Sequence, residues 1–257
     1  MNGIEEVARR FVKILCNDFG VDVIPNVIHI KLHIGLSGSY YAKTYSITIS
    51  RLDYRTIIHE FIHHLQYERI GYNYDEFVRE CLRESKKQYW LRESEIEARV
   101  MSSTLYDIYR PVFKNIFRAK PLGSERLCRE LVMAIHDQMK LVDRRIKEGY
   151  MGSVDWHAFN IDFISDYYSN IKYILRYAIR ACFRQWEIPE SEEMFRQIRL
   201  IRTLSKRYST ILKSKIELPG VEEQYKHRIE SMYNRLKSLH EEFRDMLSRV
   251  FPEYHIL

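Results

Sequence analysis

The stretch Thr56-Ile57-Ile58-His59-Glu60-Phe61-Ile62-His63-His64-Leu65 contains the pattern HExxH on an amphipathic segment. Residues four apart on a helix lie one above the other, so the imidazoles of His59 and His63 can reach a single Zn²⁺. The longer side chain of Glu60 can reach a metal-bound water, which is the position of a general base. Apolar residues cover another face of the segment, and neither Pro nor Gly interrupts it. The pattern therefore predicts a metal centre on a helix over 54–70.

A catalytic zinc needs a third protein ligand and keeps one position for water. The candidates lie in 93–99, on a helix predicted over 91–109. Glu95 and Glu97 flank the buried face of that helix about equally, whereas Glu93 points further away. The chain between His63 and Glu95 is long enough for one further helix, predicted over 74–88, and a return.

The residues before HExxH predict a helix followed by a small sheet. Apolar residues three and four apart predict a helix over 4–16. Over 26–34 the pattern alternates, with Ile28, Ile30, Leu32 and Ile34 on one side and His29, Lys31 and His33 on the other, which predicts a strand with one buried face. A hairpin or two short strands are expected over 40–50. No further strand is expected after Arg51, so the predicted fold class is α+β.

In this order of elements and in HExxH, residues 1–110 resemble the zincin metallopeptidases. The closer resemblance is to the gluzincins, including the minigluzincin and ImmA/IrrE-type catalytic domains. It implies one Zn²⁺ per chain and hydrolysis of peptide bonds in a polypeptide substrate, with Glu60 as general base. Such domains carry the ligand Glu three residues before an Ala. Glu95 and Ala98 match this spacing, so the resemblance implies the ligands His59, His63 and Glu95, with Glu97 in reserve.

Several features of the site stay open at this stage. Related glutamate helices often carry Asp or Asn four residues after the ligand, but Arg99 stands there, so the group that orients a ligand histidine must come from elsewhere. His64 lies about 100° around the helix from His63 and is expected at the surface or behind the ligands. The sequence does not choose an oxyanion donor among Tyr67, Tyr72 and Tyr74.

The substrate is expected to lie extended along the edge of the sheet, within Ser39–Ser50. There it would add a strand, and backbone hydrogen bonds would place the scissile bond over the metal. Tyr40 and Tyr41 either shape a side-chain pocket or simply pack, and packing is the commoner role of aromatic residues in strands.

The second half of the chain is predicted to be all-helical. Pro111 marks a break and suggests a boundary between a metallopeptidase domain at 1–110 and a helical domain at 111–257. Helices are expected over the following segments: 112–118, 124–148, 155–184, 191–214 and 221–250. The last two carry matching apolar stripes on either side of Pro219-Gly220, which favours an antiparallel helical hairpin. A homodimer through these helices is the alternative.

The charge of the chain is unevenly distributed. The net charge is +6, yet residues 1–110 hold 15 basic and 15 acidic residues, so the excess belongs to the second half. Basic rows occur at Lys172, Arg176, Arg180 and Arg184, and at Arg196, Arg199, Arg202 and Lys206. These rows could bind nucleic acid phosphates or an acidic protein. A solvated or internally paired face is the preferred interpretation. In the competing hypothesis for the whole protein, the zincin-like domain is structural or degenerate and these rows provide the function.

The cysteines and the N-terminal residues bear on the cellular compartment. Cys16, Cys81, Cys128 and Cys182 lie far apart and form no CxxC pair, so four buried free thiols are expected. The first residues lack the basic start and unbroken apolar stretch of a secretory signal. No apolar run approaches the length of a membrane span. A cytoplasmic protein without membrane contact is therefore expected.

Overall fold

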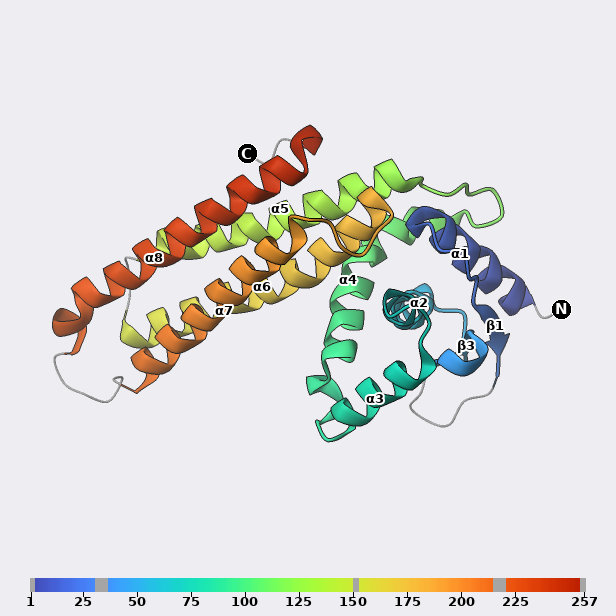
Figure 1. Ribbon diagram of the computed structural model, residues 1–257, viewed down its shortest axis with the longest axis horizontal. Coiled ribbons are helices and arrows are strands. Elements are labelled where there is room, and N and C mark those ends of the chain that lie inside the picture. The colour runs from blue at the N-terminus through green and yellow to red at the C-terminus, as the bar shows by residue number, and fades with distance from the viewer. Residues whose placement is uncertain (1–2, 31–36, 150–152, 215–220, 255–257) are drawn as a thin grey trace. The chain divides into compact units, whose positions relative to one another are not determined.

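The chain is mostly helical and contains a small three-stranded sheet. Figure 1 shows the computed structural model. The structure describes residues 3–30, 37–149, 153–214 and 221–254. Within them the α+β prediction is confirmed at the level of class. Among these residues, no helix has both the length and the apolar character needed to cross a membrane.

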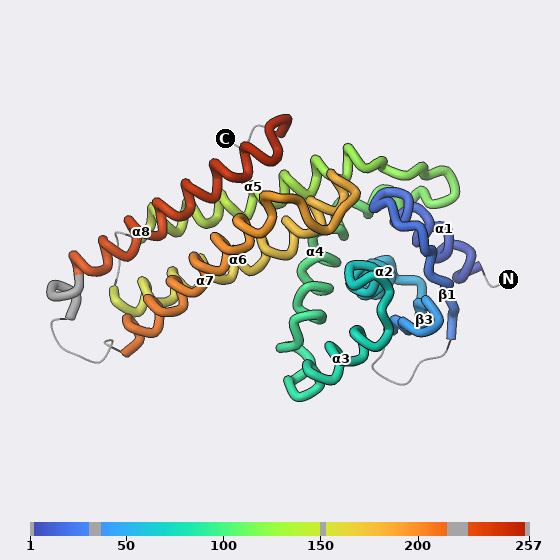
Figure 2. Tube along the Cα trace, viewed as in Figure 1, coloured from blue at the N-terminus to red at the C-terminus, as the bar shows by residue number. Residues whose placement is uncertain are grey.

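The chain divides into two compact units that are not continuous in sequence. Unit 1 contains Met1–Glu130 together with Ala178–Trp186, and unit 2 contains Leu131–Tyr177 and Glu187–Leu257. The trace in Figure 2 can be followed through both by residue number. The predicted boundary at 110–111 falls inside one helix of unit 1.

Unit 1 begins with α1 (Gly3–Phe19), followed by the strands β1 (Asn26–His29), β2 (Gly38–Tyr41) and β3 (Ser46–Ile49). The strand order is β1-β3-β2, with β1 parallel and β2 antiparallel to β3. The side chains of β3 are all buried, because the strand has a neighbour on each side and α2 packs against it. β2 is therefore an edge strand of the described sheet.

The predicted buried face of the first strand is wrong. In β1 the fully buried side chain is Val27, whereas Ile28 is only partly buried and Ile30, beyond the strand, is 38% exposed. Burial follows the face that α1 covers, and a shift of one residue exchanges the two faces of a strand. The predicted continuation through Leu32 and Ile34 lies outside the described residues.

The HExxH segment forms α2 (Tyr54–Arg69), which packs against α4 (Glu93–Lys114) and against β2 and β3. Asp53 caps its N-terminus, accepting hydrogen bonds from the Arg55 backbone N–H at 3.2 Å and the Thr56 hydroxyl at 2.9 Å. Between these helices lie α3 (Tyr74–Ser85) and the 3₁₀ helix η2 (Tyr89–Leu91). The predictions of helices over 54–70, 74–88 and 91–109 are confirmed to within a few residues, except that the last runs further.

The predicted break at Pro111 is wrong, since α4 continues through Pro111 to Lys114. A proline inside a helix removes one backbone hydrogen bond. Here that loss occurs in the last turn, where Tyr109 and Val112 are buried on the face that packs inward. The Tyr109 hydroxyl also donates to the buried Asp18 carboxylate at 2.9 Å. Tertiary packing therefore holds the helix, and the separate helix predicted over 112–118 does not form.

The remaining predicted helices are confirmed as α5 (Ser124–Glu148), α6 (Val154–Phe183), α7 (Ser191–Lys213) and α8 (Val221–Val250). Buried polar contacts link them within unit 2: Asn160 of α6 donates to the Arg145 carbonyl of α5 at 2.7 Å, and Gln197 of α7 donates to the Leu239 carbonyl of α8 at 3.2 Å. The packing of α7 against α8 agrees with the predicted hairpin. A homodimer through these helices stays a prediction.

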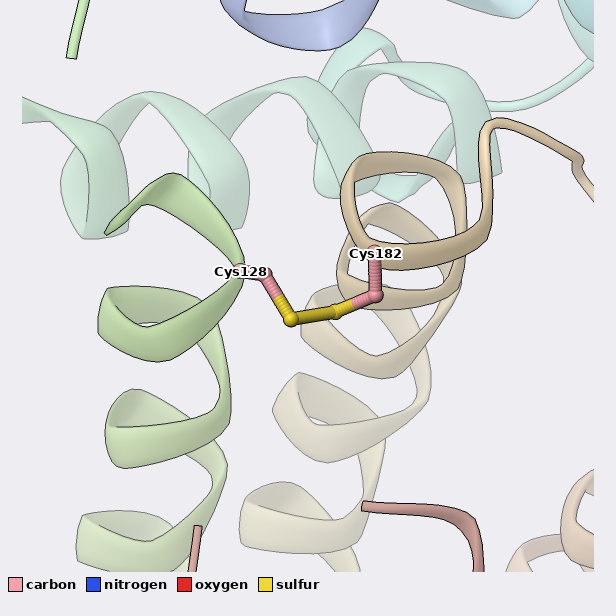
Figure 3. The surroundings of a disulfide bond; sticks show 2 residues. All are labelled: Cys128 and Cys182. Carbon is pink, nitrogen blue, oxygen red and sulfur yellow. A yellow bond between two sulfur atoms is a disulfide. The ribbon is translucent and has the colours of Figure 1, made fainter. Parts of the chain in front are cut away.

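The prediction of four buried free thiols is wrong. Cys128 of α5 and Cys182 of α6 form a disulfide within unit 1, shown in Figure 3. Cys16 is free and buried, as predicted, but Cys81 is free and exposed. The two bonded residues lie 54 apart, and such a spacing has no local signature. Disulfides are rare in the cytosol, so the thiols no longer support a cytoplasmic localisation, which stays a prediction.

Candidate metal centre

Two helices of unit 1 bring the three predicted ligands together. His59 and His63 lie on consecutive turns of α2, and Glu95 lies in the first turn of α4. The Glu95 carboxylate faces both imidazoles, with Oε2 3.3 Å from Nε2 of His59 and Oε1 3.5 Å from Nε2 of His63. One ligand atom from each residue lies within 4.8 Å of the others. Glu95 is thus the acidic residue that the fold places beside the HExxH histidines.

The donor set fits a zinc ion. Ligands about 2.0–2.1 Å from a tetrahedral ion lie about 3.3 Å from one another, which is close to the two measured separations. The Glu95 Oε2 atom is buried and has no hydrogen-bond partner. A buried carboxylate oxygen without a partner is costly, and a shared cation would satisfy it. Two imidazoles and one carboxylate also form a ligand set found in catalytic zinc sites.

A hydrogen bond to Gln66 fixes the orientation of His63. Nδ1 of His63 lies 2.8 Å from the Gln66 side-chain oxygen, and Gln66 in turn donates to the Ser94 carbonyl at 2.9 Å. An oxygen acceptor requires the proton on Nδ1, so in the neutral imidazole Nε2, the nitrogen that faces Glu95, is the atom free to bind a cation. Gln66 therefore supplies the orienting group that Arg99 does not, and it also ties α2 to the start of α4.

The first turn of α4 is held by a carboxylate from α3. Glu84 is buried and accepts hydrogen bonds from the backbone N–H of Glu93 at 2.8 Å and of Ser94 at 3.3 Å, and from the Ser94 hydroxyl. A carboxylate at a helix N-terminus satisfies unpaired N–H groups and interacts favourably with the helix dipole. This cap fixes the turn that carries Glu95.

The surroundings of Glu95 favour its ionised form. Burial opposes ionisation, but the adjacent His59 imidazole, the electrostatic interaction with His63 and hydrogen bonding from the Tyr89 hydroxyl outweigh it and lower the pKa of Glu95 to about 2. Glu95 is therefore a carboxylate at neutral pH, the form in which it can bind a cation.

Glu60 lies next to the triad but in a different environment. It is 7% exposed, and burial raises its pKa to about 7. The nearby Glu95 charge adds to the rise, whereas the charge of His63 and a hydrogen bond from the Tyr40 backbone N–H oppose it. The two neighbouring carboxyl groups therefore differ in pKa and in what they can do. Glu95 remains an anion, whereas Glu60 can exchange a proton near neutral pH.

The edge strand β2 runs past Glu60. The Tyr40 N–H bonds to the Glu60 side chain and is therefore not used for pairing with β3. At Gly38, an added Cβ would lie 2.5 Å from the Thr56 methyl carbon and 3.0 Å from the Glu60 Cγ. The strand approaches α2 this closely only because Gly38 has no side chain. Within the predicted stretch Ser39–Ser50, the open edge is therefore β2, since β3 is paired on both sides.

The other acidic candidate and Arg99 have different partners. Glu97 is 1% exposed and its carboxylate forms an ion pair with the Arg69 guanidinium at 2.5 Å. It points away from the triad, which contains Glu95 instead. The Arg99 guanidinium donates to the Trp90 carbonyl at 2.6 Å.

Of the two positions expected for His64, at the surface or behind the ligands, burial excludes the surface. His64 is fully buried, and its Nε2 donates to the Val23 carbonyl at 2.8 Å while its Nδ1 accepts from the Tyr40 hydroxyl at 2.9 Å. Burial lowers the pKa of His64 to about 4, opposed by the Val23 carbonyl, so the imidazole is neutral. Tyr40 is thus engaged in packing with His64 rather than in an open pocket, whereas Tyr41 is 50% exposed.

None of the three tyrosines considered as oxyanion donors is seen to reach the triad. The rings of Tyr67 and Tyr72 belong to an aromatic cluster with Tyr45. Tyr74 begins α3 and is 43% exposed. The hydroxyl that lies beside Glu95 belongs to Tyr89, and its pKa is raised by burial first, then by Glu95 and by the charge of Glu60.

Sequence reasoning missed Tyr89, Gln66 and Glu84. Gln66 follows His63 by three residues, a spacing at which helical side chains meet, so its contact could have been predicted. Tyr89 and Glu84 reach α4 from the preceding turn and helix. Their contacts depend on tertiary folding, for which the sequence contains no local pattern.

Two arginines of the first basic row, Arg180 and Arg184, make contacts inside the protein. Within unit 1, the Arg180 guanidinium is buried and pairs with Glu68 of α2 at 2.7 Å, and Arg184 donates to the Asp18 carbonyl at 3.3 Å. In the second row, Arg196 pairs with Glu193 on its own helix at 2.6 Å. These contacts match the preferred interpretation of an internally paired face for the residues named. Binding of nucleic acid or an acidic protein stays a prediction.

Comparisons of this chain with protein-family models, with curated proteins and with solved structures gave no match. The gluzincin resemblance of residues 1–110 stays a prediction from HExxH and the order of elements.

Proposed function

We propose that this protein is a zinc-dependent endopeptidase of the gluzincin type, with the metal held by His59, His63 and Glu95. The observation that carries the proposal is the meeting of these side chains with a buried Glu60 beside them. A purely structural metal site has no need of a carboxyl group able to exchange a proton next to its ligands. The alternative of a degenerate zincin-like domain accounts less well for Glu60.

Each residue of the centre has a distinct task in the proposed reaction. A bound zinc ion would supply Lewis acidity, polarising the peptide carbonyl and making a bound water acidic. Glu60 accepts the proton of the attacking water and returns it to the leaving amine. Gln66 holds the His63 imidazole, and the capped first turn of α4 holds Glu95.

The position of β2 supports an extended polypeptide substrate. Its edge, which is unpaired within the described sheet, runs past Glu60, and an added strand would be aligned there by backbone groups of β2 other than the Tyr40 N–H, which bonds to Glu60. Such alignment would fix the scissile bond relative to Glu60 without requiring a particular side chain.

The test is metal analysis of protein purified without chelators, together with hydrolysis of an unfolded casein substrate. We expect one zinc per chain, lost in His63→Ala and weakened in Glu95→Ala. Glu97→Ala should keep the metal, because Glu97 pairs with Arg69. Glu60→Gln should keep zinc and lose hydrolysis. Hydrolysis by zinc-loaded Glu60→Gln, or absence of zinc uptake by the unaltered protein, would refute the proposal.

A further inference from the structure

Three consecutive apolar residues lie exposed immediately before the glutamate helix. Tyr89, Trp90 and Leu91 of η2 are 47%, 66% and 58% exposed, although most large apolar side chains among the described residues are buried. Water contact at adjacent large apolar side chains is unfavourable, and such patches on soluble proteins mark interaction sites.

The patch is ordered by contacts of its own. The Arg99 guanidinium donates to the Trp90 carbonyl, the Leu91 N–H donates to the Gln88 carbonyl at 2.9 Å, and the Arg92 guanidinium lies 5.6 Å from the centre of the Tyr89 ring. Binding to a surface that is already ordered costs less conformational entropy, so the affinity is higher than for a mobile surface. Arg99, which departs from the family pattern, therefore has a role in shaping this segment.

The patch is continuous with the metal centre. The Tyr89 hydroxyl lies beside the Glu95 carboxylate, and the Tyr89 ring contacts the Trp90 ring edge to face with centroids 6.0 Å apart. A polypeptide lying over Glu60 and Glu95 therefore has Trp90 within reach of its side chains.

The charges beside the patch narrow the class of ligand. Lys86 and Lys87 are exposed in the turn that leads into η2, and Arg92 follows it. Of the two acidic residues in the same stretch, Glu84 is buried in the cap of α4 and presents its carboxylate to the backbone, and Glu93 is only partly exposed, so the three basic residues outnumber the acidic charge that faces solvent. Acidic side chains of a ligand would meet complementary charge here.

We propose that Tyr89–Leu91, flanked by Lys86 and Lys87, is the substrate-recognition surface of the centre. It binds an extended polypeptide through a large apolar side chain with acidic residues next to it. The inference rests on the proposed function for the reaction, but the binding it describes can be measured separately from hydrolysis.

The test uses full-length Glu60→Gln protein with zinc, which binds without cleaving, and short dye-labelled peptides of Gly, Ser and Ala. One peptide carries a single Phe between Glu residues, a second replaces Phe by Ala, and a third replaces Glu by Lys. Fluorescence anisotropy should show tightest binding of the Phe–Glu peptide. Trp90→Ser, added to this protein, should weaken that binding about tenfold or more, as expected for an aromatic anchor.

A matched control separates recognition from a general loss of surface apolarity. Phe117 also belongs to unit 1 and is 64% exposed, so Phe117→Ser should leave the affinity unchanged. Lys86→Glu with Lys87→Glu should reverse the preference between the Glu and Lys peptides. Equal binding of the Phe and Ala peptides, or equal effects of Trp90→Ser and Phe117→Ser, would overturn the inference.

Mass spectrometry of the same peptides after incubation with the unaltered zinc-loaded protein distinguishes the two proposals. Trp90-dependent binding without cleavage would refute the peptidase and leave a peptide-binding surface. Cleavage that Trp90→Ser does not alter would refute the recognition surface and leave the peptidase. Neither binding nor cleavage would refute both.

Discussion

Gly38 determines how closely the edge strand can approach Glu60. An added Cβ would lie 2.5 Å from the Thr56 methyl carbon and 3.0 Å from the Glu60 Cγ, so β2 or the Thr56 side chain must shift, and the Glu60 side chain must give way too. Displacement of a reacting group by about 1 Å can lower activity about 100-fold. We therefore expect Gly38→Ala to lose activity on that order while keeping zinc, measured as kcat and as metal content. Gly3→Ala meets no atom within 4 Å and serves as the control. Full activity in Gly38→Ala would show that β2 does not position Glu60.

His64 makes stability depend on pH. Its pKa falls from about 6.5 in the unfolded chain to about 4 in the fold, because burial disfavours the imidazolium. The unfolded state therefore binds more protons between these values, and the stability present above pH 6.5 declines as the pH falls toward 4. The loss attributable to His64 amounts to about 3 kcal/mol.

This dependence can be measured by urea unfolding of the metal-free protein at a series of pH values. His64→Gln keeps an acceptor for Tyr40 and a donor for the Val23 carbonyl but does not titrate, so its stability should vary less between pH 6.5 and 4. His227→Gln, at a side chain 96% exposed, should retain the dependence of the unaltered protein. Parallel curves for all three proteins would contradict the burial of a neutral His64.

At the residue scale, the sequence could predict contacts made within one helix but few made between elements. His59, Glu60 and His63 share a helix whose period fixes their relative positions, so their proximity follows from spacing alone. Spacing left Glu95 and Glu97 equivalent. The structure separates them through Arg69, which pairs with Glu97, and that contact depends on how two helices cross.

At the scale of elements, packing overrode local signals in two places. Pro111 is a helix breaker by its chemistry, yet the buried Tyr109 and Val112 hold the last turn of α4. In β1 the alternating isoleucines suggested the wrong buried face, because α1 covers Val27. Helices with long apolar stripes were predictable, since many residues agree on one face, whereas a four-residue strand offers too few positions to fix its phase.

The end of α6 is joined to α2 by a buried ion pair. Arg180 bonds to both Glu68 carboxylate oxygens and to the Gly20 carbonyl, and Trp186 donates to the same carboxylate at 3.1 Å. Removing one partner of a buried pair leaves an uncompensated charge. We expect Arg180→Met to lower the free energy of unfolding by about 3 kcal/mol, measured by urea titration.

The control for this prediction is an exposed pair of the same kind. Arg196 and Glu193 are 69% and 49% exposed, so Arg196→Met should leave the free energy of unfolding almost unchanged, because water screens an exposed ion pair. Equal losses of unfolding free energy in Arg180→Met and Arg196→Met would show that Arg180 behaves as a surface cation. The first basic row could then still bind an acidic ligand through Arg180.

At the scale of the whole molecule, unit 1 draws on two distant parts of the chain. Residues 178–186 return from the helical half, and the Cys128–Cys182 disulfide joins them to the start of α5. Charge and periodicity suggested two consecutive domains because both are read along the chain. The return of residues 178–186 to unit 1, after the chain has passed through residues 131–177 of unit 2, changes neither the charge pattern nor the periodicity, so this part of the architecture could not be predicted from the sequence.

The disulfide should contribute to stability by restricting the unfolded chain. A bond that closes a loop of this length is worth about 4 kcal/mol in the chain-entropy model. Cys128→Ser combined with Cys182→Ser should therefore unfold at lower urea than the unaltered protein. Reducing agent should lower the midpoint of the unaltered protein and leave that of the double variant unchanged. Cys81→Ser, at an exposed free thiol, should behave as the unaltered protein.

Thiol titration decides whether the bond exists under the conditions of purification and in the cell. The unreduced, denatured protein should expose two reactive thiols, from Cys16 and Cys81, and four after reduction. Alkylation in intact cells before lysis extends the measurement to the native compartment, because disulfides persist where the surroundings are oxidising. Four reactive thiols without reduction would mean that residues 178–186 are held in unit 1 by noncovalent contacts only, among them the bonds of Arg180 and Trp186 to Glu68, and Arg180→Met would then be the more damaging change.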